Sequence, residues 1–202
     1  MSKPDQMSQS YVMSDDAIRF ATMIMAGQGV SNEHAGIIAE CLVEADLRGV
    51  QTHGLSRLPV YVERVQRGLV KAVPNMKLEK PVVACASLDG DNGFGFLVGR
   101  RAMQEAITMA DSCGVGVVAA RNSNHFGMAA TYLLQAVKAG YFAFVFTNAS
   151  KAMPPWGGRG GLLGTSPFGA AAPAGKLPPF VLDMSPAVAA RGKIRLAEKR
   201  GE

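Results

Sequence analysis

A strand, a helix and a second strand follow one another in the middle of the chain, and this order constrains the fold most. Residues 82–88 are rich in β-branched and apolar side chains, and the Asp89-Gly90 pair after them predicts a turn. Residues 96–112 carry apolar side chains at helical spacing, and residues 115–120 form another β-branched run. Together they predict one βαβ unit with parallel strands, and therefore an α/β fold.

Helical patterns precede this unit. The expected elements are helices over residues 14–26, 31–47 and 59–67, followed by a basic connector over residues 69–80. Ser14 and Ser31 are placed to serve as N-caps, and Gly68 is placed to end the third helix in a left-handed conformation. His34 falls in the first turn of the second helix, where no functional role is expected for it.

The chain after the unit alternates again between regular and irregular patterns. The expected elements are a helix over 127–139, a buried strand over 141–147, an irregular segment over 147–175, a strand over 180–184 and a basic C-terminal helix begun by Ser185-Pro186. The irregular segment is rich in glycine and proline, and it either lines a ligand cleft or covers the core. No lysine precedes Thr165, so an ATP-binding loop of the Walker type is not expected.

A glycine-rich sequence lies between the first strand and the helix of the βαβ unit. Gly93, Gly95 and Gly99 give the spacing GxGxxxG, which differs by one residue from the dinucleotide-binding pattern. The strand expected before them also does not run directly into the glycines. We therefore expect a turn with close backbone packing rather than a phosphate-binding loop.

Composition and charge narrow the function classes. The formal net charge is +5, but the basic residues are scattered and not interleaved with aromatic ones, so binding of nucleic acid is not expected. Cys41, Cys85 and Cys113 are odd in number and lack CxxC spacing, which favours reduced thiols over disulfides or a metal site. The polar N-terminus lacks a signal-peptide core, and no apolar run is long enough for a bilayer. We expect a cytoplasmic protein without membrane segments.

The segment from Asp46 to Arg57, DLRGVQTHGLSR, gathers residues suited to catalysis between two predicted helices. His53 can exchange a proton near neutral pH, and Arg57 offers a planar fork for a carboxylate. They suit an anionic carbonyl substrate. The alternative is a helix-ending loop in which these charges cap helix ends and the histidine binds a backbone carbonyl.

Two further residues lie where predicted strands end. His125 follows the strand over 115–120, and ligands of open α/β sheets bind beyond the carboxyl ends of parallel strands. Its alternative role is that of a satisfied histidine in a helix-capping loop. Asp183 ends the strand over 180–184, where it can fix the tautomer of a histidine, bind a ribose, or cap a helix.

Several segments, taken together, resemble a known family. They read DLRGVQTHGLSRLPVY, DGDNGFG, NSNHFGMA, GTSPFGAAAPAG and FVLDMSPAVAARGKI. They are similar to the malate/L-lactate dehydrogenase family of NAD(P)-dependent 2-oxoacid reductases, which is distinct from the Rossmann-fold lactate and malate enzymes. The resemblance runs from about Ser14 to Gly201. It implies the non-Rossmann fold of that family: an N-terminal helical region, then a mixed sheet with flanking helices.

The resemblance also implies an organisation along the chain. Residues 1–13 are expected to be a disordered arm, residues 14–80 a helical substrate-side region, and residues 81–202 an α/β cofactor-binding region. Family members continue well past residue 202, so this region is expected to be incomplete at its C-terminus, and the chain to be the N-terminal part of such an enzyme.

The resemblance assigns roles by position. His53 would donate the proton to the substrate carbonyl, with Thr52 beside it and Asp183 in support, and His125 would be a further acid/base residue. Arg57, and with it Arg48, would hold the substrate carboxylate. NAD or NADP would contact Asp183, Met184, Ser185, Asn148 and Ala149. The implied partners are a small 2-oxoacid and a second copy of the chain, as a homodimer.

Two positions depart from the family pattern, and one alternative function stays open. Thr52 stands where some relatives have serine, and Ser166 replaces the asparagine common in GTNPFG, which puts the hydrogen bonds of that residue in question. The leading function is hydride transfer between NAD(P)H and a small 2-oxoacid or 2-hydroxyacid. The alternative is a truncated, inactive fragment that acts at most as a binding or assembly module.

Overall fold

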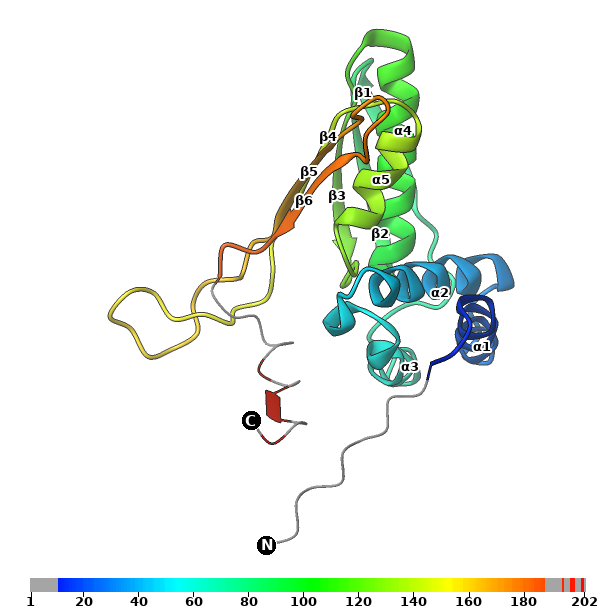
Figure 1. The fold of residues 1–202 in the computed structure, drawn as a ribbon, viewed down its shortest axis with the longest axis vertical. Helices are drawn as coiled ribbons and strands as arrows, with labels where there is room; N and C mark the ends of the chain where they lie inside the picture. Colours follow the sequence, from blue (N-terminus) through cyan, green and yellow to red (C-terminus); the bar gives the residue numbers. More distant parts are fainter. Residues whose placement is uncertain (1–10, 188–193, 195–196, 199–200, 202) are drawn as a thin grey trace, which may run out of the picture.

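The structure, a computed structural model, describes residues 11–187, 194, 197–198 and 201 (Figure 1). Three helices lie at one end of the molecule, and two three-stranded sheets with two further helices extend from them. This confirms the expected α/β class, with the helical region first along the chain. The expected C-terminal helix after Ser185 lies largely outside the described residues, as does most of the arm over 1–13.

The N-terminal helices form the largest apolar core. They are α1 (Ser14–Ala26), α2 (Asn32–Leu47) and α3 (Leu58–Gln66). Met25, Ile38 and Leu42 are fully buried in this core, which also receives Phe94 and Phe96 from the start of the βαβ helix. Because the three helices pack on that helix start, the loops between them are held beside the sheet.

Of the three caps expected for the N-terminal helices, two are confirmed and one is not. The Ser31 hydroxyl accepts a hydrogen bond from the His34 backbone N–H at 3.3 Å, as an N-cap does. Gly68 follows α3 with φ of +67°, the left-handed conformation that ends a helix. Ser14, however, is already the first helical residue, and Met13 precedes it without a capping side chain.

The βαβ unit is confirmed. It consists of β2 (Cys85–Gly93), α4 (Gly95–Cys113) and β3 (Val117–Ser123), with β2 and β3 parallel. An antiparallel strand, β1 (Lys77–Val82), extends the sheet on the other side of β2, which makes it mixed. The carboxyl ends of β2 and β3 therefore both point toward the N-terminal helices (Figure 1).

Two details of this region were predicted wrongly. The Asp89-Gly90 pair does not end the strand, since β2 continues to Gly93 and the reversal lies before it, at residues 83–84. Gly90 is needed inside the strand because a Cβ there would lie 2.7 Å from Val98 Cγ2 of α4. The connector over 69–80 is also shorter than expected, because β1 begins at Lys77 and crosses the predicted boundary between the two regions.

The glycine-rich sequence makes close contacts, as expected. A Cβ on Gly93 would lie 2.6 Å from Pro74, one on Gly95 2.2 Å from the Asn124 carbonyl oxygen, and one on Gly99 2.7 Å from the Tyr132 ring. The strand does run into these glycines, contrary to expectation, with Phe94 as the single residue between β2 and α4. The start of α4 is thus packed against the loop that carries His125.

The second sheet is antiparallel and is packed against α5. It contains β4 (Ala143–Phe146), β5 (Phe168–Ala172) and β6 (Phe180–Met184), with β5 in the centre, and α5 spans Ala130–Lys138. Strand β5 lies within the segment expected to be irregular. Its small residues have weak strand preference, but α5 requires them, because a Cβ on Gly169 would lie 2.7 Å from Leu133 Cδ1.

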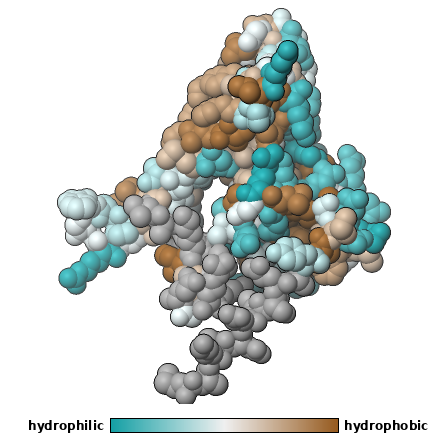
Figure 2. Space-filling model, in the orientation of Figure 1, coloured by the Kyte–Doolittle hydropathy of each residue, from teal (hydrophilic) through white to brown (hydrophobic). Residues whose placement is uncertain are grey.

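Strand β4 was expected to be buried, but it is covered on one face only, where Ala143 and Val145 pack against α4 and α5. Phe144 and Phe146 are 56% and 72% exposed. They form a row of ring contacts with Phe142 on one side and Phe168 on the other. Apolar surface gathers on the sheet-bearing part of the molecule in Figure 2. The apolar run in the sequence predicted a strand correctly. Whether both faces of such a strand are buried depends on which elements pack against each face.

Candidate active site

Two short 3-10 turns connect α2 to α3 and carry the residues singled out in the sequence. They span Gln51–His53 and Leu55–Arg57, with Gly54 between them. The Asp46 carboxylate accepts a hydrogen bond from the Leu55 backbone N–H at 2.8 Å. Burial raises the pKa of this carboxyl group, and the bond from Leu55 acts in the opposite direction. Asp46 thus holds the second turn from the end of α2.

Gly54 is required by that contact. A Cβ at this position would lie 1.8 Å from one Asp46 carboxylate oxygen, although the backbone of Gly54 is in an extended conformation open to any residue. The requirement is therefore one of space. The close approach fixes His53 and Arg57 on either side of the glycine.

The His53 side chain is largely enclosed. Its Nδ1 lies 2.9 Å from the Thr52 hydroxyl. Burial lowers the pKa of His53, the positive charge of Arg57 lowers it further, and the negative charge of Asp183 opposes them. The imidazole is therefore mainly neutral at pH 7, and if the Thr52 hydroxyl donates to Nδ1, the ring proton lies on Nε2.

His125 lies beside His53, although it belongs to a distant part of the sequence. The two rings stack with centroids 5.4 Å apart and planes 20° apart. His125 belongs to the loop between β3 and α5, and its Nδ1 lies 2.8 Å from the Tyr61 hydroxyl of α3. The fold thus brings together two histidines that the sequence separates by more than seventy positions.

Arg57 lies close to Tyr61 of α3. Its Cζ lies 6.0 Å from the centroid of the Tyr61 ring. Its Nε is buried and has no hydrogen-bond partner among the residues that the structure describes. Arg57 also lines the groove described below, where its positive charge suits an anionic ligand.

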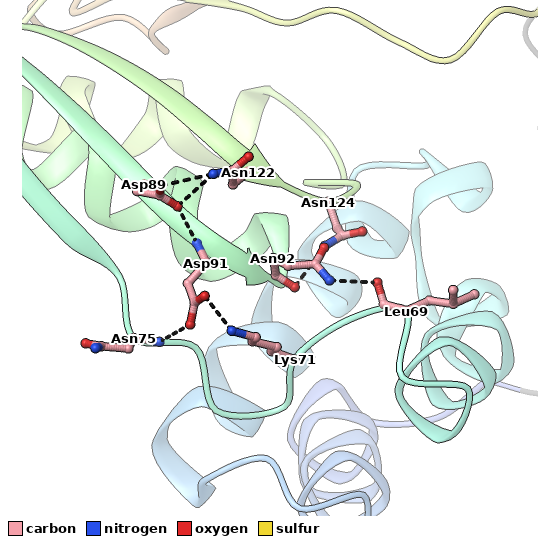
Figure 3. A network of polar contacts seen from close by, with 8 residues as sticks. All are labelled: Leu69, Lys71, Asn75, Asp89, Asp91, Asn92, Asn122 and Asn124. Carbon is pink, nitrogen blue, oxygen red and sulfur yellow. Dashed lines mark hydrogen bonds and ion pairs between the residues drawn. The ribbon is translucent and has the colours of Figure 1, made fainter.

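A polar network ties the His125 loop to the end of β2 (Figure 3) and, through Arg64, to α3. The Asn124 amide nitrogen donates to the Gly93 carbonyl at 3.0 Å and to the Asn92 side chain at 2.9 Å. Its amide oxygen accepts from Arg64 of α3 at 2.9 Å. In the same network the Asn122 amide donates to the Asp89 carboxylate. The loop that carries His125 is thereby fixed from several sides.

An open groove of about 1850 Å³ begins at these residues and runs along β3 and β4. The predicted site residues that line it are Thr52, His53, Arg57, His125, Asn148 and Ala149. Residues 148 and 149 follow the end of β4, so the groove joins the His53 turns to the second sheet. Tyr61 and Arg64 line it as well.

The remaining predicted site residues lie elsewhere. Asp183 accepts a hydrogen bond from the Ala130 backbone N–H at 2.8 Å, so its carboxylate caps the first turn of α5 and acts on His53 through its charge. Met184 is 40% exposed, and the Ser185 hydroxyl accepts from the Ala187 backbone N–H. Arg48 pairs with Glu44 on α2 at 3.4 Å. Neither Arg48 nor residues 183–185 line the groove.

Reasoning from the sequence did not single out Tyr61, Arg64 or Asn124. Tyr61 and Arg64 are three positions apart on α3 and so point the same way, but their partners are about sixty residues distant. The available signal was the pair of asparagines, Asn122 and Asn124, just before His125. Among the described residues, no three histidine, cysteine or acidic side chains are grouped as metal ligands would be. None of the described helices has the length and apolar character needed to cross a membrane.

Comparison with known proteins places this geometry in a family. Residues 12–202 match the family model described as malate/L-lactate dehydrogenase. A malate dehydrogenase of Pyrococcus abyssi is 39% identical over 95% of this chain and 52% of its own. The L-sulfolactate dehydrogenase of Methanocaldococcus jannaschii is 43% identical over 82% of this chain and 48% of its own.

Solved structures agree with the sequence matches. The crystal structure of malate dehydrogenase from Entamoeba histolytica is 30% identical, covers 96% of this chain and 54% of its own, and superposes with a TM-score of 0.92. The chain spans about half the length of the curated relatives it matches. On the match of nearly its whole length to the family model, the chain belongs to the malate/L-lactate dehydrogenase family.

Proposed function

We propose that the protein is an oxidoreductase that interconverts a small 2-oxoacid and the corresponding 2-hydroxyacid with NAD or NADP. One observation carries the proposal: His53 and Arg57, from adjacent turns, line the same groove. A residue able to exchange a proton thus lies beside a cation in one groove. The names of the relatives, malate and sulfolactate dehydrogenases among them, support the same substrate class.

Arg57 is proposed to bind the substrate carboxylate. Arg57 lines the groove, and its guanidinium can donate hydrogen bonds to a carboxylate that enters there. This contact orients the carbonyl carbon relative to His53. A bound carboxylate also offsets the charge by which Arg57 lowers the pKa of His53, so that protonated His53 becomes more populated once the substrate is in place.

His53 is proposed to carry the proton of the reaction at Nε2. During reduction the imidazolium gives this proton to the carbonyl oxygen, and during oxidation the neutral ring takes it from the hydroxyl group. The Thr52 hydroxyl beside Nδ1 holds the ring in orientation. Asp183 stabilises the imidazolium through its charge, from its position at the start of α5.

The groove also fits a nicotinamide cofactor. It extends from His53 to Asn148 and Ala149 at the end of β4, where amide and backbone groups are available to the cofactor. When bound, the cofactor supplies or removes the hydride at the substrate carbon. Contacts from Asp183, Met184 and Ser185 remain a prediction. Some relatives are named for NAD and others for NADP, so the proposal includes both cofactors.

A turnover assay tests the proposal. The complete gene product is assayed with NADH and with NADPH against a panel of 2-oxoacids and cyclic imino acids. For the active pair, His53→Ala is expected to lower kcat at least about a hundredfold, because general acid catalysis is lost. His34→Ala is the control, since this histidine lies on α2 outside the groove. Equal turnover in wild type and His53→Ala would exclude His53 as the proton donor.

Homodimer assembly and a cytoplasmic location belong to the same proposal. The exposed rings of Phe144 and Phe146 supply apolar surface of the kind that is covered in an assembly. Light scattering of the complete gene product tests the dimer.

In the turnover assay, absence of turnover with every substrate would favour the alternative function, an inactive binding or assembly module.

A further inference from the structure

Two hydrogen-bond donors converge on one nitrogen of His125. The Gly127 backbone N–H approaches Nδ1 at 3.3 Å, and the Tyr61 hydroxyl lies 2.8 Å from the same atom. A backbone N–H can only donate, so Nδ1 must be the unprotonated nitrogen of the ring. The Tyr61 hydroxyl must then donate to it as well, and the proton of the neutral imidazole lies on Nε2.

Tyr61 is well placed to keep this arrangement. Its ring packs edge-on against Phe94 and Phe96 in the N-terminal core, with centroids 6.3 and 5.3 Å away. Burial raises the pKa of its hydroxyl group, while the neighbouring Arg57 acts in the opposite direction. The hydroxyl therefore keeps its proton at neutral pH and remains a donor.

The surroundings of His125 oppose protonation of the ring. Burial lowers its pKa to about 3, and Arg57, His53 and Arg64 add to the effect through their positive charge. With the Tyr61 hydroxyl, these are the titratable and charged groups that face it from the 3-10 turns and from α3. Asn124, which precedes His125, is held by Arg64 and by the end of β2, so the loop that carries the ring is fixed there.

We propose that His125 works as a neutral hydrogen-bond donor, with its Nε2–H directed at an oxygen of the bound oxoacid, and that Tyr61 is the positioning residue that fixes this tautomer. The inference rests on the proposed function and makes it sharper, because proton transfer then belongs to His53 alone. His125 neither gives nor takes a proton in the cycle. It stabilises the negative charge that develops on the substrate oxygen.

The first test reads the tautomer directly, without substrate. Long-range proton–nitrogen correlation spectra of the histidine rings are recorded for wild type, Tyr61→Phe and Tyr11→Phe. Wild type is expected to show His125 in the Nε2–H form, without titration between about pH 5 and 8. Tyr61→Phe keeps the ring packing but loses one donor, and it is expected to show a mixture of tautomers. Tyr11→Phe removes a hydroxyl from a 94% exposed side chain and should match wild type.

The second test separates a neutral donor from an acid/base residue. In His125→Gln an amide N–H takes the place of Nε2–H but cannot titrate. Loss of one such donor typically lowers kcat on the order of a hundredfold, as expected for His125→Ala, while His125→Gln should retain activity within about tenfold of wild type. In Tyr61→Phe, kcat should fall roughly threefold to tenfold with little change in KM, because one hydrogen bond biases the tautomers by about that ratio.

Three results would overturn the proposal: an Nδ1–H tautomer in wild type, titration of His125 in the neutral range, or a His125→Gln variant as inactive as His125→Ala. If His125→Gln does not fold, the spectra of wild type and Tyr61→Phe still decide. The spectra also separate the two proposals. A protein with the Nε2–H tautomer but no 2-oxoacid turnover would contradict the proposed function and, with it, the donation to an oxoacid, while the role of Tyr61 in fixing the tautomer would stand.

Discussion

Replacement of Gly54 by alanine tests how the two 3-10 turns that carry His53 and Arg57 are held. The added Cβ would lie 1.8 Å from an Asp46 carboxylate oxygen and 2.2 Å from its Cγ. The Asp46 side chain can rotate away, but it then gives up the bond from the Leu55 N–H, which is 2.8 Å long. The backbone of Gly54 is extended and adds no strain of its own.

The expected magnitude follows from the lost bond. A hydrogen bond to a charged group contributes about 1.5 to 3 kcal/mol, so Gly54→Ala should lower the free energy of unfolding by that amount. In an Asp46→Ala background the steric conflict is absent. There the same substitution should be close to neutral, or stabilise by about 0.4 to 1 kcal/mol, because alanine restricts the unfolded chain.

A double-mutant cycle measures the difference. Urea unfolding of wild type, Gly54→Ala, Asp46→Ala and the double variant gives the coupling free energy between the two positions. In parallel, kcat should fall in Gly54→Ala, because His53 and Arg57 flank the altered residue. Equal costs of Gly54→Ala in both backgrounds would show that Asp46 is not what the new methyl group displaces, and would refute the reasoning.

Four further outcomes are expected. Arg57→Lys should raise KM for carboxylate substrates roughly tenfold to a hundredfold, since a point charge replaces a fork worth about 1.5 to 3 kcal/mol, and an unchanged KM would contradict its role. In the oxidation direction, kcat/KM should rise with pH through an apparent pKa below 6.5, as the lowered pKa of His53 requires, and Arg57→Gln should move that value upward. Below the pKa of an unfolded histidine the unfolded chain binds a proton that buried His125 does not, so stability should fall by up to about 1.4 kcal/mol per pH unit from about pH 6.5 to 5, and less steeply in His125→Gln. Ser166 has φ of +40°, so Ser166→Asn should raise the urea midpoint, because asparagine tolerates this conformation better.

Local patterns in the sequence determined most of the secondary structure. The apolar spacing of the helices, the N-cap at Ser31 and the glycine after α3 are local signals, and each is confirmed. The parallel βαβ unit followed from the order of its elements along the chain. The family could also be recognised from the sequence, because its motifs are contiguous segments.

Tertiary packing decided what depends on distant neighbours. Strand β5 was missed because its small residues are explained only by the α5 helix that lies on them, and Gly90 was mistaken for a turn because Val98 was not known to face it. Arg48 and Arg57 have the same chemistry, yet only Arg57 reaches the groove.

The tautomer of His125 belongs to the same class of property. It is set by Tyr61, sixty-four positions away, and by a backbone N–H whose direction exists only in the folded loop. A sequence names the groups that can exchange protons. Their protonation and orientation depend on burial and on partners that only folding brings together.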